Sequence, residues 1–218
     1  MKAEVLKTVE GTRLVAIIRG MDPEICMRLA EAYAEGGIRL VEVTFDQSGD
    51  PRKTVAAIKA IREGFAGRLH VGAGTVLTAA QLQMVIDAGG EFMVTPSTNP
   101  MLIRAASAAG LATMPGAFTP TEIVTAHEAG ADIVKVFPVR SLGPQYVKDV
   151  LAPLKHISLM AVGGVNPDNA ADYLKAGCVG VGASGSLVNR EWIAAGEWLK
   201  IAAEAGRFIS NLKNGDGR

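Results

Sequence analysis

The fold is decided by the stretch Asp132-Ile133-Val134-Lys135-Val136-Phe137-Pro138, an apolar run with a lysine in its middle and a proline at its end. Side chains alternate between the two faces of a strand, so Lys135 shares a face with Ile133 and Phe137, and both faces are otherwise apolar. We expect this strand to be buried on both sides. Burial of a lone ammonium is costly and favours a neutral, nucleophilic amine, which is what a Schiff-base lysine needs. The alternative is a lysine whose ammonium reaches water or a carboxylate.

Working outward from this stretch, short apolar runs alternate with helical segments about eight times along the chain. The expected strands are residues 14–19, 40–45, 70–76, 92–96, 112–116, 132–138, 159–164 and 179–184. Helix starts are marked by cap signals such as Asp22-Pro23, Thr78 and Thr119-Pro120. Pro167 is expected to open the helix that ends at Gly177, and a long helix from Trp192 to Leu212 is expected to close the chain.

Regular alternation of strands and helices predicts a parallel sheet, and eight units predict an α/β protein of the (β/α)8 TIM barrel type. A lead-in helix at residues 3–10 precedes the first strand, and the whole chain, residues 1–218, is expected to form one domain. The alternative is an open doubly wound sheet. That fold is disfavoured because no G-x-G-x-x-G motif follows the first strand.

Composition excludes several classes of protein. The 22 basic and 22 acidic residues give a net charge of zero, so no nucleic-acid or membrane-surface partner is expected. The chain has no apolar stretch of about 18 residues and no apolar signal core at its start, which predicts a cytoplasmic location. Cys26 and Cys178 show no pairing motif, and His70, His127 and His156 lack metal-ligand spacing. No metal or cofactor is therefore expected.

Four polar residues occupy late positions on strands that are otherwise apolar: Arg19, Glu42, Thr75 and Lys135. By strand alternation they share faces as follows: Arg19 with Val15 and Ile17, Glu42 with Leu40 and Thr44, Thr75 with Val71 and Ala73. Active sites of this fold lie at the C-terminal ends of the strands, so these four side chains are expected to converge on one pocket. The structural alternatives are an Arg19–Glu42 ion pair and a Thr75 that satisfies nearby backbone groups.

Small residues follow the last two strands. Gly163-Gly164 ends the seventh strand, and Ser184-Gly185 follows the eighth. Barrels commonly hold phosphate in these two loops, through backbone N–H groups that small residues leave open to an anion. The sequence therefore predicts a phosphate site at Gly163, Gly164, Ser184 and Gly185, with tight-turn geometry as the alternative.

Four motifs, in this order and spacing, carry a family resemblance: Glu-Val-Thr at 42–44, Gly-Ala-Gly-Thr-Val at 72–76, Lys-Val-Phe-Pro at 135–138 and Gly-Gly-Val at 163–165. They resemble the 2-keto-3-deoxy-6-phosphogluconate aldolase family of class I aldolases, and the likeness spans residues 14–187. Three motifs resemble the branch that acts on 2-keto-3-deoxy-6-phosphogalactonate: Ile-Ile-Arg-Gly at 17–20, Gly-Pro-Gln-Tyr at 143–146 and Ala-Val-Gly-Gly-Val at 161–165.

The resemblance implies that a phosphorylated 2-keto acid is cleaved to pyruvate and glyceraldehyde 3-phosphate, and that the chain forms a homotrimer. It implies Lys135 as the imine-forming lysine, Glu42 as the general acid and base, and Arg19 and Thr75 as substrate ligands. Phe137 is expected to keep the amine dry. Cleavage of 4-hydroxy-2-oxoglutarate or decarboxylation of oxaloacetate by the same imine stays open. So does a phosphate-binding isomerase or binding protein without an imine.

The chain departs from the family pattern in two places. Many members carry an arginine where this chain has Asp46, and many have Gly-Ser where this chain has Ser184-Gly185. We expect Arg19, Thr75 and the free N–H groups of the helix start after Pro96 to meet the substrate carboxylate instead. Asp46 is expected to contact substrate hydroxyls and to bias selection at C4 toward the galactonate epimer.

Overall fold

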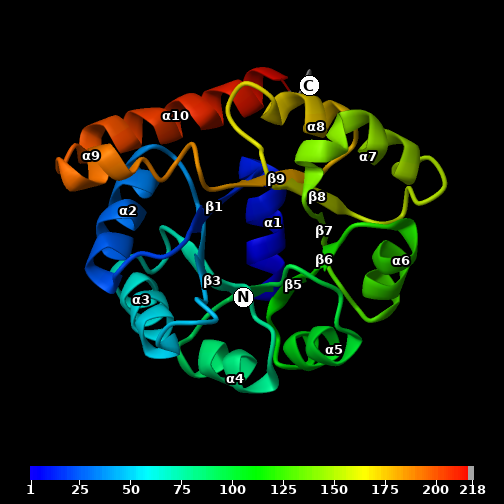
Figure 1. Cartoon of the computed structure of the whole chain (residues 1–218), viewed down its shortest axis with the longest axis horizontal. Helices are drawn as coiled ribbons and strands as arrows, with labels where there is room; N and C mark the ends of the chain where they lie inside the picture. Colours follow the sequence, from blue (N-terminus) through cyan, green and yellow to red (C-terminus); the bar gives the residue numbers. More distant parts are fainter. Residues whose placement is uncertain (216–218) are drawn as a thin grey trace.

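The computed structural model describes residues 1–215 of the chain, and the side chains as far as Lys213. A ring of helices surrounds the strands, and the first helix crosses the centre of the ring (Figure 1). The strands are β1 (Leu14–Ile18), β2 (Leu40–Thr44), β3 (His70–Gly74), β4 (Phe92–Val94), β5 (Ala112–Met114), β6 (Gly116–Ala117), β7 (Val134–Val136), β8 (Leu159–Val162) and β9 (Gly180–Ala183). The helices are α1 (Lys2–Thr12), α2 (Pro23–Glu35), α3 (Pro51–Gly64), α4 (Ala79–Asp87), α5 (Pro100–Ala108), α6 (Pro120–Glu128), the 3-10 turn η1 (Val139–Ser141), α7 (Gly143–Leu151), α8 (Ala170–Lys175), α9 (Arg190–Ala194) and α10 (Trp198–Gly215).

All pairings between strands are parallel, in the order β5-β4-β3-β2-β1-β9-β8-β7-β6. The two ends of this order, β5 and β6, are halves of the fifth expected strand, separated by Pro115. Proline has no N–H to give to a ladder, which accounts for the interruption. Since β5 pairs with β4 and β6 pairs with β7, the sheet closes on itself. The predicted (β/α)8 barrel is confirmed.

Most helix starts follow the cap signals of the sequence. Thr119 and Glu122 form a complete capping box at α6, and Thr78 caps α4. Two expectations are wrong. The helix expected at Pro167 begins at Ala170, because Asn166 accepts hydrogen bonds from the N–H groups of the two residues that follow the proline. The expected closing helix is two helices, α9 and α10, with Gly196 at a left-handed φ of 69° between them.

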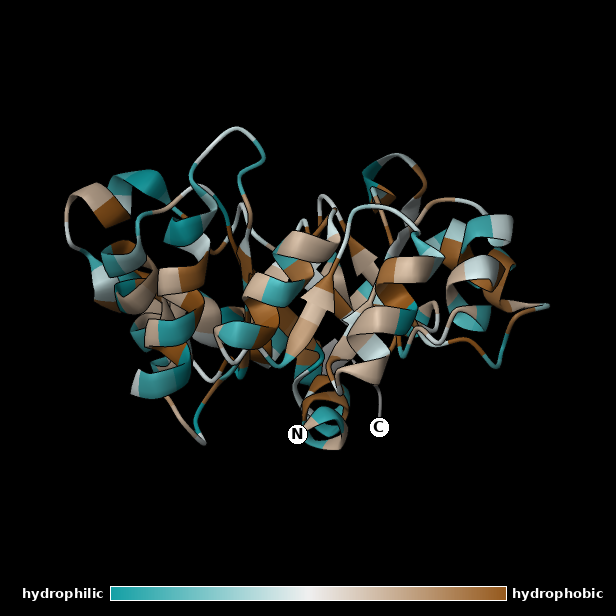
Figure 2. Ribbon diagram, turned by 90° about the horizontal axis from the view of Figure 1, so that it is seen from below, coloured by the Kyte–Doolittle hydropathy of each residue, from teal (hydrophilic) through white to brown (hydrophobic). Residues whose placement is uncertain are grey.

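Apolar side chains form two layers. The inner cluster fills the barrel and includes Val15, Leu40 and Ile133, and it also contains Val5 and Val9 of α1. Because Val15 and Leu40 lie near the starts of their strands, α1 closes the N-terminal end of the barrel. Figure 2 shows this helix beneath the ring of helices, opposite the loops that follow the strands. The second cluster fills the layer between the strands and the outer helices.

The inward faces agree with the sequence expectation on β1, β2 and β7 but not on β3. Val71 and Ala73 belong to the outer layer, so the inward positions are Gly72 and Gly74. A side chain at Gly72 would lie 2.4 Å from the ring of Phe92, a member of the inner cluster. The expectation that Thr75 shares an inward face with Val71 and Ala73 is therefore wrong.

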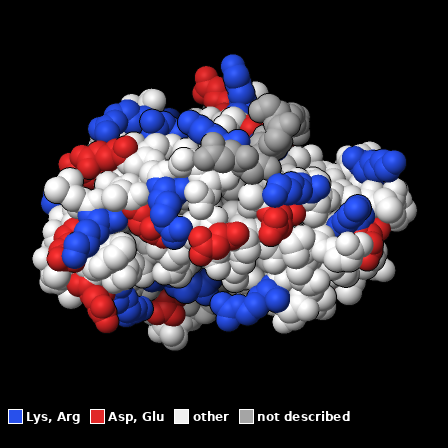
Figure 3. All heavy atoms as spheres, turned by 90° about the horizontal axis from the view of Figure 1, so that it is seen from above, with Lys and Arg blue, Asp and Glu red and all other residues white. Residues whose placement is uncertain are grey.

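Basic and acidic side chains are interspersed over the face seen in Figure 3, without a large patch of either sign. This distribution matches the balanced charge of the sequence. Within residues 1–215, no helix has the length and apolar character needed to cross a membrane.

Candidate active site

Lys135 lies in the middle of β7, where both backbone neighbours are fully buried. Its side chain is 5 % exposed and faces the barrel interior with Ile133, a member of the inner cluster, and Phe137, which packs against that cluster. The Lys135 Nζ lies 4.7 Å from the centre of the Phe137 ring. Burial lowers the pKa of the amine below its ordinary value, and the charge of Arg19 lowers it further, while Glu42 acts in the opposite direction.

Glu42 enters the same interior from β2, and its side chain is 2 % exposed. Burial raises the pKa of the carboxyl, whereas the charges of Lys135 and Arg19 lower it. Room for the carboxylate comes from Gly74 on the neighbouring strand, where an added Cβ would lie only 1.7 Å from Glu42 Oε1. A glycine in the Gly-Ala-Gly motif is thus needed so that Glu42 can lie across β3.

A cavity of about 420 Å3 opens at the C-terminal ends of β1, β7, β8 and β9. Its lining includes two guanidinium groups, those of Arg19 and Arg140, together with Phe137, which connects the cavity to the lysine. The other predicted residues that line it are Gly163, Gly164, Ser184 and Gly185. Ser186 also lines it, and its buried hydroxyl has no hydrogen-bond partner in the described structure. Two cations, open backbone and a free hydroxyl suit an anion.

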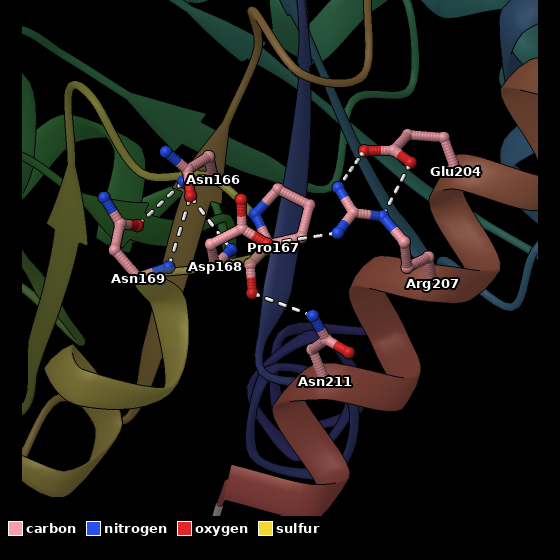
Figure 4. Close-up of polar contacts among 7 residues, drawn as sticks. All are labelled: Asn166, Pro167, Asp168, Asn169, Glu204, Arg207 and Asn211. Carbon is pink, nitrogen blue, oxygen red and sulfur yellow. Dashed lines mark hydrogen bonds and ion pairs between the residues drawn. The ribbon is translucent and has the colours of Figure 1, made fainter.

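The loop that follows β8 is held from two sides. Asn169 Nδ2 donates to the carbonyl of Gly164 over 3.1 Å, which fixes the glycine pair from within the loop. From outside, Arg207 of α10 pairs with Asp168 over 3.1 Å, and Asn211 donates to the Pro167 carbonyl (Figure 4). The long last helix therefore anchors one wall of the cavity.

Thr75 and Pro96 lie at the ends of β3 and β4. Thr75 directly follows β3 and has a positive φ of 57°, which breaks the alternation of the strand. The Pro96 carbonyl packs against Gly116, where an added Cβ would lie 2.5 Å away, and Gly116 is the pairing partner of Lys135. Asn99 accepts hydrogen bonds from the N–H groups of Met101 and Leu102 at the start of α5. The expectation of free N–H groups at this helix start is wrong for these two donors.

Asp46 lies outside the glycine-lined cavity. One oxygen of its carboxylate accepts hydrogen bonds from the N–H and the hydroxyl of Ser48, over 3.0 and 2.8 Å. These bonds lower the pKa of Asp46. It lines a separate crevice, together with Asp22 and Lys53, near the starts of α2 and α3. The expected contact between Asp46 and substrate hydroxyls stays a prediction.

Arg140 and Ser186 line the cavity but are not among the predicted site residues. Arg140 lies in η1, just beyond the strand that carries Lys135, and Ser186 lies in the loop after β9. Strand alternation does not place Arg140, which lies in a turn, and the prediction for the loop after the last strand was limited to Ser184 and Gly185. The position of Arg140 was nevertheless a usable signal, because loops at the C-terminal ends of barrel strands build the sites of this fold.

The parts can act together. A buried amine with a lowered pKa is a nucleophile, a buried carboxyl with a raised pKa can accept and return a proton, and both face a cavity suited to an anion. Their charges are close enough to shift each other's pKa values. Within the described residues, no group of three or more histidine, cysteine, aspartate or glutamate side chains could hold a metal ion.

Comparison with known proteins identifies one family. The model of the family "Aldolase: KDPG and KHG aldolase" matches residues 5–204. A "Probable 2-dehydro-3-deoxy-6-phosphogalactonate aldolase" of Rhizobium meliloti (strain 1021) is 41% identical over 175 residues, or 80% of this chain and 81% of the relative. The solved structure "Native KDPGal structure" has a TM-score of 0.82 and 33% identity, and the match covers 93% of this chain and 95% of that one. The KDPG aldolase of Legionella pneumophila, with pyruvate captured as a covalent carbinolamine intermediate, has a TM-score of 0.82 at 25% identity, over 92% and 96% of the two chains.

Proposed function

The chain belongs to the KDPG and KHG aldolase family, as its sequence motifs indicated, and on that premise we propose that it cleaves a 2-keto-3-deoxy-6-phospho sugar acid. The products are pyruvate and glyceraldehyde 3-phosphate. As a member of a family of aldolases, the chain is a carbon–carbon lyase. The observation that carries the proposal is the buried amine of Lys135, whose pKa lies below its ordinary value. A neutral amine is the nucleophile that a Schiff base requires.

The reaction uses Lys135 and Glu42 in turn. The amine of Lys135 adds to the C2 carbonyl, and loss of water gives a protonated imine. The carboxylate of Glu42 takes the proton of the C4 hydroxyl while the C3–C4 bond breaks. The electron pair of the C3–C4 bond moves toward the protonated imine and forms an enamine. After the aldehyde leaves, Glu42 returns the proton to C3, and water hydrolyses the imine to release pyruvate. The raised pKa of Glu42 suits a group that both accepts and returns a proton.

We place the substrate phosphate in the glycine-lined cavity. Gly163 and Gly164 have φ values of 97° and 92°, a conformation that glycine adopts without steric cost. The ligands assigned to the phosphate are the backbone at Gly163, Gly164, Ser184 and Gly185, the guanidinium of Arg140 and the hydroxyl of Ser186. Arg19 lines the same cavity, which supports contact with the phosphate end instead of the carboxylate end expected from the sequence. Thr75 and the loop at Pro96 are then the proposed ligands of the substrate carboxylate.

The phosphate assignment is tested by the rate of cleavage of the phosphorylated acid and of its unphosphorylated analogue. Arg140→Met should raise KM for the phosphorylated acid by about 10- to 100-fold, the value of a hydrogen bond to a charged group, and leave the analogue unaffected. The matched control is Arg104→Met, because Arg104 is an exposed arginine of α5 outside the cavity. Equal changes of KM for both substrates would place the phosphate elsewhere.

The galactonate epimer is the proposed substrate. This choice rests on the similarity to the phosphogalactonate aldolase of Rhizobium meliloti and on the motifs at 17–20 and 143–146. The family description also names KHG, and 4-hydroxy-2-oxoglutarate cleavage is the second candidate. The cavity with two arginines favours the phosphorylated acid. Comparing kcat/KM for the two phosphorylated C4 epimers and for 4-hydroxy-2-oxoglutarate decides between them, and Asp46→Asn should change the ratio between the epimers.

We also propose a homotrimer in the cytoplasm. For the trimer, support comes from three exposed apolar side chains on consecutive barrel units, all at the C-terminal end of the strands: Leu77, Met101 and Phe118. Met101, the most exposed of the three at 78 %, is the side chain that a partner subunit would bury. The cytoplasmic location rests on the sequence alone.

A further inference from the structure

Thr75 has a backbone conformation that its residue type disfavours. Its φ of 57° lies in the left-handed region, which β-branched residues rarely adopt. Continued strand geometry would place it on the same side as Val71 and Ala73, against the outer helices. Strained residues of this kind persist only where their surroundings hold them, and they concentrate at functional sites.

Two glutamines hold the backbone on both sides of this residue. Gln47, in the loop after β2, donates from Nε2 to the Thr75 carbonyl over 2.8 Å. Gln81, in the first turn of α4, accepts at Oε1 from the Leu77 N–H over 2.8 Å. The two side chains are joined to each other, because Gln81 Nε2 donates to Gln47 Oε1 over 3.0 Å. The three bonds form one bridge from the Thr75 carbonyl to the Leu77 N–H.

We propose that Gln47 and Gln81 are positioning residues: their bridge fixes Thr75 in the left-handed conformation in which it binds the substrate carboxylate. The inference rests on the proposed function, in which Thr75 meets that carboxylate. Within the described structure, the Thr75 hydroxyl has no hydrogen bond of its own, so it is free to donate to a substrate oxygen. The bridge links two loops that follow neighbouring strands, β2 and β3, and β2 also carries Glu42.

A purely structural role for Gln81 is the competing explanation. Its backbone N–H donates to the Thr78 hydroxyl, so its side chain could serve only to complete the cap of α4. That explanation gives Gln47 no part in the site. The two accounts therefore differ most at Gln47, which lies outside every helix.

The test measures KM and kcat for the phosphorylated acid in Gln47→Met and Gln81→Met, which keep side-chain length and remove the amide. We expect KM to rise about tenfold, the value of one hydrogen bond, in each variant, with kcat changed less than KM. Because both changes break one bridge, the double variant should lose no more than either single variant. The matched control is Gln83→Met: Gln83 is an exposed glutamine of the same helix, and among the described residues its side chain bonds to Asp87 alone.

Thr75→Ala separates the bridge from the substrate contact. In a Thr75→Ala background, Gln47→Met should raise KM by less than about twofold, because nothing remains for the bridge to position. The bridge proposal alone would be overturned if Gln47→Met raised KM equally in the native and the Thr75→Ala backgrounds. It would also be overturned if Gln47→Met raised KM no more than Gln83→Met does. A native KM in Thr75→Ala would remove Thr75 from the substrate site, and the bridge proposal with it. If Gln81→Met lowers the melting temperature and leaves KM unchanged, Gln81 is only a cap.

Discussion

Lys135 and Glu42 each change the proton affinity of the other across the barrel interior. Burial is the larger influence on both: it lowers the pKa of the amine and raises that of the carboxyl, so it favours the neutral form of each. Their mutual attraction opposes burial, and the charge of Arg19 lowers both pKa values. Together, burial and these charges allow the Lys135 amine to act as a nucleophile and the Glu42 carboxyl to act as an acid.

Replacing the two charged neighbours of Lys135 should shift the pH dependence of imine formation in opposite directions. The charge of Glu42 raises the pKa of Lys135, so Glu42→Gln lowers that pKa and moves the rising limb of the rate to lower pH. The charge of Arg19 lowers the same pKa, so Arg19→Met moves the limb to higher pH. The measurement is the rate of pyruvate trapping by cyanoborohydride as a function of pH. Shifts of the same sign would contradict this electrostatic account.

At the scale of elements, the Glu42 side chain of β2 can lie across β3 because Gly74 of β3 has no side chain. Glu42 is the pairing partner of Gly72, and its carboxylate occupies the space above Gly74. The position of Glu42, the proposed general acid and base, is thus set by its neighbour strand as well as by its own. Packed interiors adjust little to added atoms, so this dependence should be visible in function.

Gly74→Ala should displace the Glu42 carboxylate, because the added methyl lies 1.7 Å from Oε1. We expect a stability loss of about 1–3 kcal/mol from overpacking. Exchange of the pyruvate methyl protons with deuterated water should slow by about 10²- to 10⁴-fold, the value of a general acid or base, while pyruvate trapping on Lys135 continues. The control is Gly11→Ala in α1, where nothing lies within 4 Å of the added methyl. Native exchange in Gly74→Ala would mean that Glu42 does not transfer this proton.

The sequence predicted the strands well and their connections less well, for physical reasons. Strand positions follow from apolar runs bounded by caps, and inward faces follow from alternation as long as the strand stays regular. Thr75 lies where regularity ends, and no local signal predicts a left-handed threonine held by Gln47 and Gln81. Arg140 was missed because it lies beyond the strand. The break at Gly196 was missed because a glycine inside a helical pattern is often tolerated.

At the scale of the whole molecule, the two ends of the barrel differ. Helix α1 closes the N-terminal end with Val5 and Val9, and Lys2 joins Asp132 over 2.9 Å. The C-terminal end carries the candidate site and the exposed side chains Met101 and Phe118. An apolar surface of this kind, next to a site, is what a subunit interface would cover.

Met101→Glu should dissociate the proposed trimer, because it places a charge in the apolar interface. Sedimentation velocity at micromolar concentration should then report monomers, against trimers for the native chain. The matched control is Leu199→Glu on α10, since Leu199 is exposed to a similar degree, 81 % against 78 % for Met101, but lies away from the proposed surface. Trimers that survive Met101→Glu would move the interface elsewhere, and a monomeric native chain would contradict the trimer itself.

The most direct test of the central claim is to reduce the protein with borohydride in the presence of pyruvate and to measure its intact mass. The account predicts one adduct per chain, and peptide mapping should place it on Lys135, the buried amine with the lowered pKa. Lys135→Ala should lose both the adduct and the cleavage activity. An adduct of undiminished yield on Lys135→Ala would show that another amine forms the imine and would contradict the account.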